Sequence, residues 1–496
     1  MSEHFSASKT DILQNSEILE RFAAHPFSTL ETYQYFNQKG EAAKLVKADF
    51  IAKALQGNSP EAPDFSYESI DLDDLLIKRD ELTAILEEVS LLDMTNEENT
   101  LARENITNRI HEVGILILTK LQSQTEVGSE QYANISYQLG ENMREVYGVP
   151  EVNHWRGILG YRLSLLKEVE HRSDVPDQII SAWRRISDEF PKDLPIEKPY
   201  QPRPETLAWY KDRLDERLTP AREAVTRAIE NGEVGLSDEG KLDAHNIVIA
   251  TRIALIAGGA TGWGAKITTA SNIDTSQTDM MVNVPETSEM TLSQFDSVIN
   301  SHEIDEHVIR RVNGDSSGVA VLGGTGCNGY LDWEEGNGRA NEGLIKGEII
   351  NQNSAFLYFL HGGLALGLDG DRTGRTFGAT FDLVCLMNLI DSFLEGKITA
   401  DNIETEQRKV MESTYNSLMR IYRGTDGKTP GVIFTKDVLS YYLGQVKVFR
   451  KWDNDMKLSE EKRLEEHNLE RRAKIDPTRP DHRRVASKYL HATPIR

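Results

Sequence analysis

Cysteine is nearly absent from this chain of 496 residues, which contains only Cys327 and Cys385. Two cysteines cannot build a disulfide framework or a cysteine-rich zinc module, and their scarcity favours a reducing compartment. The N-terminal residues lack a basic region followed by an apolar stretch, so no signal peptide is visible. No run approaches the roughly 18 apolar residues of a membrane span. We therefore expect a cytoplasmic protein without a membrane span.

Basic residues are also in deficit. The chain has 56 Lys and Arg against 79 Asp and Glu, which gives a formal net charge of -23. Binding to nucleic acid or to an anionic membrane requires basic faces that displace counterions. The charge balance therefore argues against both partners. With 39% hydrophobic residues, the chain still has enough apolar material for a sizeable core.

The pattern of apolar residues changes along the chain. Helical spacing dominates from about Leu75 to Tyr147, and a second mostly helical stretch is interrupted by a proline-rich break at 191–204. After Gly258, the segments Ala265–Ser271 and Met280–Val284 have the composition of short strands. A capping box at 291–294 then predicts the start of another helix.

One motif stands out for its chemistry: His302 and His307 are five positions apart, and Glu303 follows the first histidine. In the usual zincin helix the two histidines are four apart and share one face. Five positions in a regular α-helix would place them about 140° apart. A shared metal therefore requires one extra residue in the turn, as in a π-bulge. Glu303 would then be the general base, which takes a proton from a water that the zinc activates.

A third ligand is expected from the segment Trp333–Gly336, which begins another predicted helix. A peptidase zinc needs three protein ligands and an open position for water. Glu335 is the preferred candidate because it stands directly before a glycine, and Glu334 is the alternative. The interpretation is a zinc site at His302, His307 and Glu335.

These residues resemble the tyrosine and microtubule-associated carboxypeptidase family, whose bacterial members are mostly uncharacterised. The resemblance extends from about residue 60 to 455, and its main blocks are His302–His307 with 310–314, Glu334–Gly336, and Arg420–Thr425 with 431–437 and 442–444. It implies the same zinc ligands, Glu303 as catalyst, and removal of C-terminal residues from proteins or peptides. Asp305 and Glu306 depart from the family pattern and would add two acidic groups beside the metal. Residues 336–339 depart as well, and both departures point to a different substrate choice.

Binding of a free C-terminal carboxylate calls for cationic side chains, and arginine suits it best through its bidentate fork. The candidates in the third block are Arg420, Arg423 and Lys436, while Tyr442 is a candidate for steadying the oxyanion. Surface or structural roles for these residues, and a packed Tyr442, stay open. The strand predicted at Met280–Val284 is a candidate for holding an extended peptide by strand addition.

We therefore expect a predominantly helical, zincin-like α+β fold with a small sheet beside the zinc helix. Residues 1–60 would form a partly disordered N-terminal part, 61–240 a helical region packed on the core and 241–455 the catalytic domain. Residues 456–496 would form a charged C-terminal tail, either a solvated helix or an extended segment. The expected activity is that of a carboxypeptidase-like zinc metallopeptidase. A catalytically inactive metal-binding interaction module of the same fold is the alternative, and the intact Glu303 argues against it.

Overall fold

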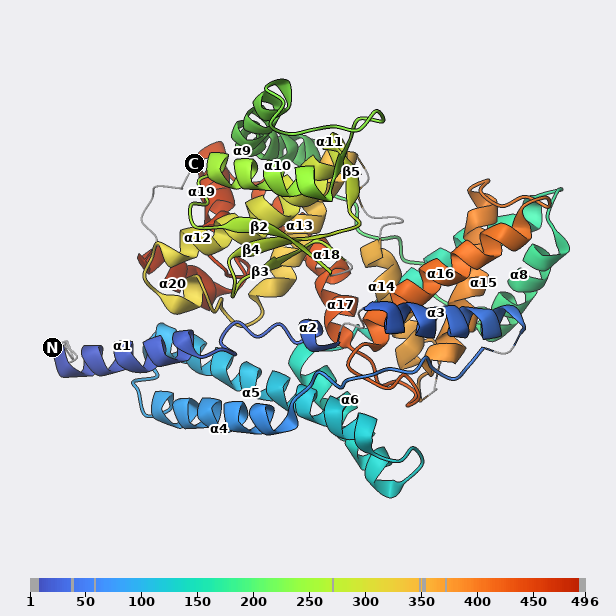
Figure 1. The fold of residues 1–496 in the computed structure, drawn as a ribbon, viewed down its shortest axis with the longest axis horizontal. Coiled ribbons are helices and arrows are strands. Elements are labelled where there is room, and N and C mark those ends of the chain that lie inside the picture. The colour runs from blue at the N-terminus through green and yellow to red at the C-terminus, as the bar shows by residue number, and fades with distance from the viewer. Residues whose placement is uncertain are drawn as a thin grey trace.

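Helices make up most of the protein, and short strands form two small sheets within it (Figure 1). The computed structural model describes residues 9–36, 40–57, 59–269, 272–347, 349, 354–370 and 373–489. The prediction of a predominantly helical α+β fold with a small sheet is confirmed at this level. The end of the strand predicted at Ala265–Ser271, residues 270 and 271, lies outside the described residues.

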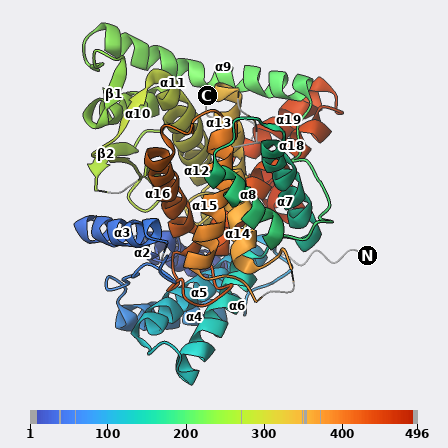
Figure 2. The same ribbon diagram turned by 90° about the vertical axis from the view of Figure 1, so that its right-hand side faces the viewer.

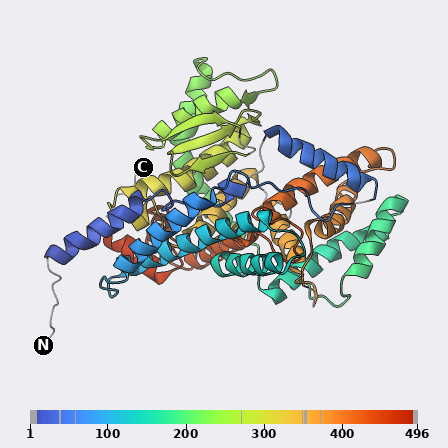
Figure 3. The ribbon, with the colours of Figure 1, turned by 60° about the horizontal axis from the view of Figure 1, so that its bottom comes forward.

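The N-terminal helices lie side by side along one face of the molecule (Figures 1 and 3). Side chains at three helix starts, Asp71, Asn96 and Ser129, accept hydrogen bonds from first-turn N–H groups that would otherwise lack a partner. The apolar sides of these helices form a common buried cluster. This layer comprises α1 (Lys9–Ala24), α2 (Tyr33–Phe36), α4 (Leu72–Val89), α5 (Glu97–Gln124) and α6 (Glu130–Tyr147).

A helical bundle forms a second part of the molecule (Figure 2). It contains α3 (Gly40–Leu55), α7 (Val152–Leu166), η1 (Lys167–His171), α8 (Asp177–Glu189), α14 (Ser354–Leu366), α15 (Phe377–Leu394) and α16 (Ile403–Tyr422). Among the described helices, α15 alone is long and apolar enough to cross a membrane, and most of it is buried inside the protein. Its Phe377 and Phe381 pack around Phe50 of α3, with ring centroids 5.2 and 5.0 Å away. Helix α15 is therefore a core element of the bundle.

The sheets lie in a third part, beside α9 (Pro204–Glu230) and α10 (Ala244–Ala257) (Figures 1 and 3). The larger sheet has the order β2 (Gly264–Thr268), β4 (Met281–Pro285), β3 (Asp274–Ser276); β4 runs parallel to β2 and antiparallel to β3. The smaller one pairs β1 (Lys241–Asp243) with β5 (Glu289–Thr291). Both predicted strands are therefore present, within the described residues.

The expectation that the strand at 280–284 binds a peptide is wrong. Strand β4 is paired on both sides, with Val282 opposite Ala265 of β2 and opposite Thr275 of β3. Its backbone N–H and C=O groups are therefore used within the sheet. The strand at the edge nearest the histidine helix is β3 instead.

The histidine helix follows the sheets directly. It begins at α11 (Leu292–Gln294), where Thr291 and Gln294 form the predicted capping box. It then continues as the π-helix η2 (Phe295–Val308) and ends as α12 (Ile309–Asp315). After η3 (Ala320–Leu322), the chain forms α13 (Tyr330–Lys346), which packs along η2.

The C-terminal segment, predicted as a solvated helix or tail, is helical and partly buried. After α17 (Thr435–Ser440) and α18 (Tyr442–Asp455), it forms α19 (Glu460–Arg471) and α20 (Pro480–Tyr489). Between the last two helices, Ala473, Lys474 and Ile475 are fully buried. Arg310 of α12 donates hydrogen bonds to the carbonyl oxygens of Ala473 and Ile475, at 3.0 and 2.5 Å. Part of this segment is therefore packed into the fold, while other charged residues such as Glu460 and Lys462 stay exposed.

The largest buried apolar cluster joins residues from distant parts of the sequence. It runs from Phe50 of α3 to Trp452 of α18 and includes Trp155 and Trp333. Helices α14 to α16, which the sequence assigns to the catalytic domain, pack against α3, α7 and α8. The packing therefore crosses the predicted domain boundaries.

Candidate metal centre

His302, His307 and Glu335 converge on one point. One ligand atom from each lies within 4.8 Å of the other two. The Nε2 atom of His302 is 3.4 Å from Glu335 Oε2, and that of His307 is 3.9 Å from Glu335 Oε1. All three side chains are buried or nearly so. The group is of the kind that holds a metal ion.

The π-helix makes this convergence possible. Hydrogen bonds in a π-helix close from residue i to residue i+5, so residues five apart return to the same face. The N–H of Ile309 bonds the carbonyl of Ile304 in this way. As a result the rings of His302 and His307 lie with centroids 5.0 Å apart. The distorted turn that the spacing of the histidines requires is confirmed.

Two further glutamates orient the histidines. His302 Nδ1–H donates to Glu342 Oε1 at 2.6 Å, and His307 Nδ1–H donates to Glu334 Oε2 at 2.9 Å. Because an ionised carboxylate only accepts, each bond fixes the proton on Nδ1 and leaves Nε2 as the free ligand atom. Such carboxylate–histidine pairs typically support metal ligands. Glu334 is therefore a support for His307, and Glu335 is the third candidate ligand.

The carboxylates around the histidines favour positive charge at this point. Burial alone lowers the pKa of His302, but hydrogen bonds with Glu335 and Glu342 outweigh it and raise that pKa to about 10. Burial acts against Glu335 in the same way, yet the two histidines bring its pKa down to about 2. A divalent cation bound here would balance the carboxylate charge and could be coordinated by the histidine nitrogens. The donor set therefore fits a metal ion.

Glycines in α13 allow the histidine helix and α18 to pack closely against it. A Cβ atom at Gly338 would stand 2.8 Å from Cδ2 of the His302 ring, closer than side chains pack. A Cβ at Gly336 would stand 2.1 Å from the carbonyl carbon of Gly444 in α18. These glycines, in the segment that departs from the family pattern, therefore set the distance between the ligand-bearing helices.

Glu303 lies beside the three ligands and is held by the sheet. Thr275 of β3 donates a hydrogen bond from Oγ1 to Glu303 Oε2 at 2.6 Å, and both residues are buried. Across the described residues, nothing donates a hydrogen bond to the other carboxylate oxygen, Oε1. One oxygen is thus anchored, and the other is free to accept a proton.

The candidate ligands face a large cavity. Its volume is about 660 Å³, and its lining includes His302, Glu303, His307 and Glu335. The cavity is also lined by the N-terminal segment at Thr29–Glu31, by β3 and by α13. A volume of this size admits a small peptide or a drug-sized ligand.

Three of the four predicted substrate-binding residues line this cavity: Arg420, Arg423 and Lys436. Asp437 binds both arginines: Arg423 Nη2 donates to its two oxygens at 2.7 and 2.6 Å, and Arg420 Nε donates at 3.2 Å. Lys436 is less engaged, with Nζ 4.0 Å from Glu112 Oε1. The three predicted cations therefore line the cavity. Arg420 and Arg423 are bound to Asp437, whereas Lys436 has its nearest carboxylate 4.0 Å away.

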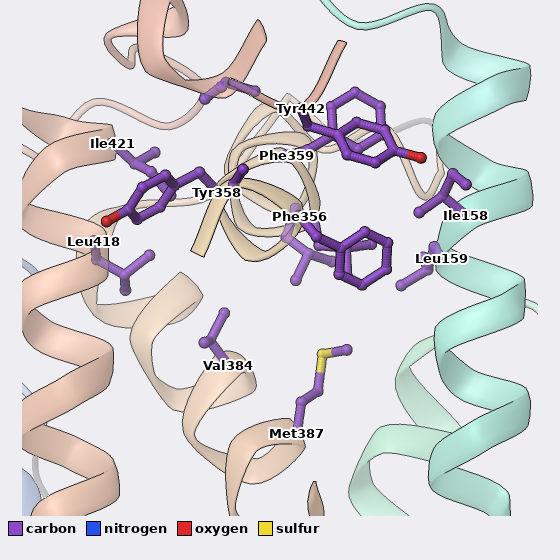
Figure 4. Close-up of a cluster of buried hydrophobic side chains, with 14 of the residues drawn as sticks. Ile158, Leu159, Phe356, Tyr358, Phe359, Val384, Met387, Leu418, Ile421 and Tyr442 are labelled. Carbon is purple, nitrogen blue, oxygen red and sulfur yellow. The ribbon is translucent and has the colours of Figure 1, made fainter. Parts of the chain in front are cut away.

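Tyr442, the fourth, is in the core. Its ring packs against Phe359 and Phe356, with centroids 4.6 and 5.7 Å away (Figure 4), and its side chain is fully buried. The preceding residue, Tyr441, lines the cavity and accepts a hydrogen bond from Arg420 Nη2 at 3.0 Å. The tyrosine that faces the site is therefore Tyr441, one position before the predicted Tyr442.

Asp305 and Glu306 do not lie in the cavity, contrary to expectation. Asp305 pairs with Arg217, at 3.0 Å, and with Arg471. Glu306 is fully buried and accepts hydrogen bonds from Arg310 and Asn337. Both carboxylates bind neighbouring helices, so they add no charge to the substrate side of the site.

Lys474 is a part of the site that the sequence pattern did not indicate. Its buried ammonium donates to both oxygens of Glu334, at 3.0 and 2.9 Å, and Glu334 in turn orients His307. Burial lowers the pKa of Lys474 although Glu334 opposes that shift. The C-terminal segment thereby reaches the support of a metal ligand. Its signal in the sequence is only a single apolar–basic–apolar triplet at 473–475.

Searches of protein-family models and of curated proteins give no match to this chain. The resemblance to the carboxypeptidase family thus stays a prediction based on its residue blocks.

Proposed function

We propose that this protein is a zinc metallopeptidase that removes residues from the C-terminal end of proteins or peptides. The observation that carries the proposal is the convergence of His302, His307 and Glu335 beside Glu303 in one cavity. Two histidines and one glutamate are a donor set typical of catalytic zinc, which keeps a position open beside three protein ligands. Zinc bound there supplies Lewis acidity, which polarises a carbonyl group and acidifies water.

Glu303 is suited to the role of general base. Thr275 holds its Oε2 atom, so Oε1 is the oxygen that accepts a proton from the attacking water. The same oxygen can return this proton to the leaving amine. The neighbouring Tyr441, whose hydroxyl is held by Arg420, is placed to donate a hydrogen bond to the developing oxyanion.

Strand β3 is the element best placed to align a peptide. It is the edge strand of the β2–β4–β3 sheet, and its residues Asp274 and Thr275 line the cavity. A peptide in extended form can pair with such an edge through main-chain hydrogen bonds. The scissile bond would then pass beside Glu303, which Thr275 of the same strand holds.

Hydrolysis of a peptide panel tests the proposal. Zinc-loaded protein is expected to release C-terminal residues from peptides with free C-termini, and mass spectrometry would identify the products. Glu303→Gln should lower kcat by about 100-fold or more while zinc content is unchanged, because general-base catalysis contributes about 10²–10⁴-fold. If zinc-loaded native protein turns over no peptide and equals Glu303→Gln in every assay, the chain is a metal-binding interaction module.

A further inference from the structure

Arg339 lies one helical turn beyond Glu335 on α13, and both line the cavity. Four residues of an α-helix advance by about 6 Å, so the guanidinium group starts from a point one turn from the metal ligand. The side chain keeps 22% of its surface exposed. The position is thus close to the reacting groups and open to a ligand.

Arg339 uses only one of its five N–H groups in a hydrogen bond to a described residue. Its Nη1 donates to Glu342 Oε1 at 3.1 Å, and the guanidinium group stacks over the Tyr441 ring, 5.0 Å from its centroid. The buried Nε has no acceptor, and no described residue accepts from Nη2. Because Nε is buried, the end of the guanidinium group formed by Nη2 and the second N–H of Nη1 is the part left for a ligand, and this end can bind a carboxylate through two parallel hydrogen bonds.

Each of the other guanidinium groups of the cavity is paired with a carboxylate of the fold. Arg420 and Arg423 share Asp437, and Arg109 donates to Glu112 at 2.5 Å and to a backbone carbonyl. Asp437 lines the cavity too, so a substrate carboxylate beside Arg420 or Arg423 would lie close to its negative charge. Arg339 does share Glu342, but Lys346 also pairs with that carboxylate, at 2.9 Å.

We infer that Arg339 binds the terminal carboxylate of the substrate, with its ring partner Tyr441 as the adjoining wall. The inference rests on the proposed function and makes it more specific. One residue of extended chain spans roughly 3.5 Å and a charge-assisted hydrogen bond adds roughly 2.8 Å, so the last peptide bond of a bound substrate stays within about one residue of Arg339. A carboxylate held by Arg339 therefore keeps that bond in the cavity that Glu335 and the two histidines line. The substrate class is peptides with a free C-terminus, shortened by one residue at a time.

Binding of a matched pair of probes tests this inference without requiring turnover. The probes are N-acetyl-Ala-Phe and its C-terminal amide, titrated by calorimetry into zinc-loaded Glu303→Gln protein. We expect the acid to bind at least tenfold more tightly than the amide, since charge-assisted bidentate bonds are the strongest class. Adding Arg339→Met should bring the ratio of the two affinities close to one. Arg339→Lys keeps the charge and the partner Glu342 but not the fork, and should lose most of the preference.

Lys346→Met is the matched control, because Lys346 also pairs with Glu342 but does not line the cavity. It should disturb zinc affinity through Glu342 as much as Arg339→Met does, yet keep the preference for the acid. The inference is overturned if the acid preference survives in Arg339→Met and Arg339→Lys, or vanishes equally in Lys346→Met. It is also overturned if Lys436→Met alone abolishes the preference.

The outcome is separable from that of the proposed function. If no peptide is hydrolysed but the acid preference depends on Arg339, the carboxylate site stands and peptidase activity does not. If peptides are hydrolysed while the acid and the amide bind equally, the protein is a peptidase that does not recognise the terminal carboxylate through Arg339.

Discussion

At the scale of single residues, the two candidate histidine ligands and the proposed base are each oriented by another side chain. Glu342 and Glu334 hold the two histidines, and Thr275 holds Glu303. Such support restricts each side chain to the geometry that its chemistry needs. The removal of a supporting group should therefore reduce activity without removing a reacting atom.

Thr275 gives the sharpest test at this scale. Thr275→Val removes the hydrogen bond to Glu303 but keeps the shape of the side chain, whereas Thr275→Ser keeps the hydroxyl. A hydrogen bond to a charged group contributes about 1.5–3 kcal/mol, so steady-state kinetics should show kcat reduced by about tenfold or more in Thr275→Val with little change in KM. Thr275→Ser should stay near the native rate, and zinc content should not change in either. Equal rates for the valine and serine variants would contradict the role of the hydroxyl.

At the scale of elements, the histidine helix was the most predictable part of the site. Two ligands five positions apart cannot meet in an α-helix, so a shared metal demands the π-helix that is found. Strands β2 and β4 and the capping box at Thr291 were predictable as well, because their signals are local. The side chain that faces the cavity at the junction of α17 and α18 was not predictable. Tyr441 lies between α17 and α18, and the irregular turn there decides which of Tyr441 and Tyr442 faces the cavity.

Long-range pairing of charges was equally hidden from local patterns. A charged segment is interpreted as solvated when the partners of its charges are far away in the sequence. Asp305, which pairs with Arg217 and Arg471, and Glu334, which pairs with Lys474, stand 88 to 166 positions from those partners. The strand order that places β3 at an edge was not predictable either, because β2 pairs directly with β4 although β3 lies between them in the sequence.

At the scale of the whole molecule, the candidate metal centre is enclosed by segments from both ends of the chain. The N-terminal segment at Thr29–Glu31 lines the cavity, and the C-terminal segment supplies Lys474 from behind. Arg310 ties that segment to the histidine helix through two carbonyl groups. The site therefore depends on the complete fold and is not confined to residues 241–455.

Lys474 tests this dependence. Lys474→Met leaves Glu334 as a buried carboxylate without its lysine partner, a change that costs about 3–5 kcal/mol in buried pairs. We expect a lower melting temperature in calorimetry and a zinc affinity reduced by about 10–100-fold, as for other groups that support metal ligands. Lys474→Arg should restore much of both. Lys462→Met, in an exposed position of α19, is the matched control and should behave as native. Native zinc affinity in Lys474→Met would show that the C-terminal segment does not support the site.

The zinc content of the purified protein tests the central claim most directly. Elemental analysis should find stoichiometric zinc in the native chain and none retained by His302→Ala. The control is His154→Ala, because His154 also pairs with a glutamate, Glu197 at 3.0 Å, but lies outside the site. It should retain zinc as the native chain does. Stoichiometric zinc in His302→Ala, or a native chain that binds no zinc at all, would contradict the account.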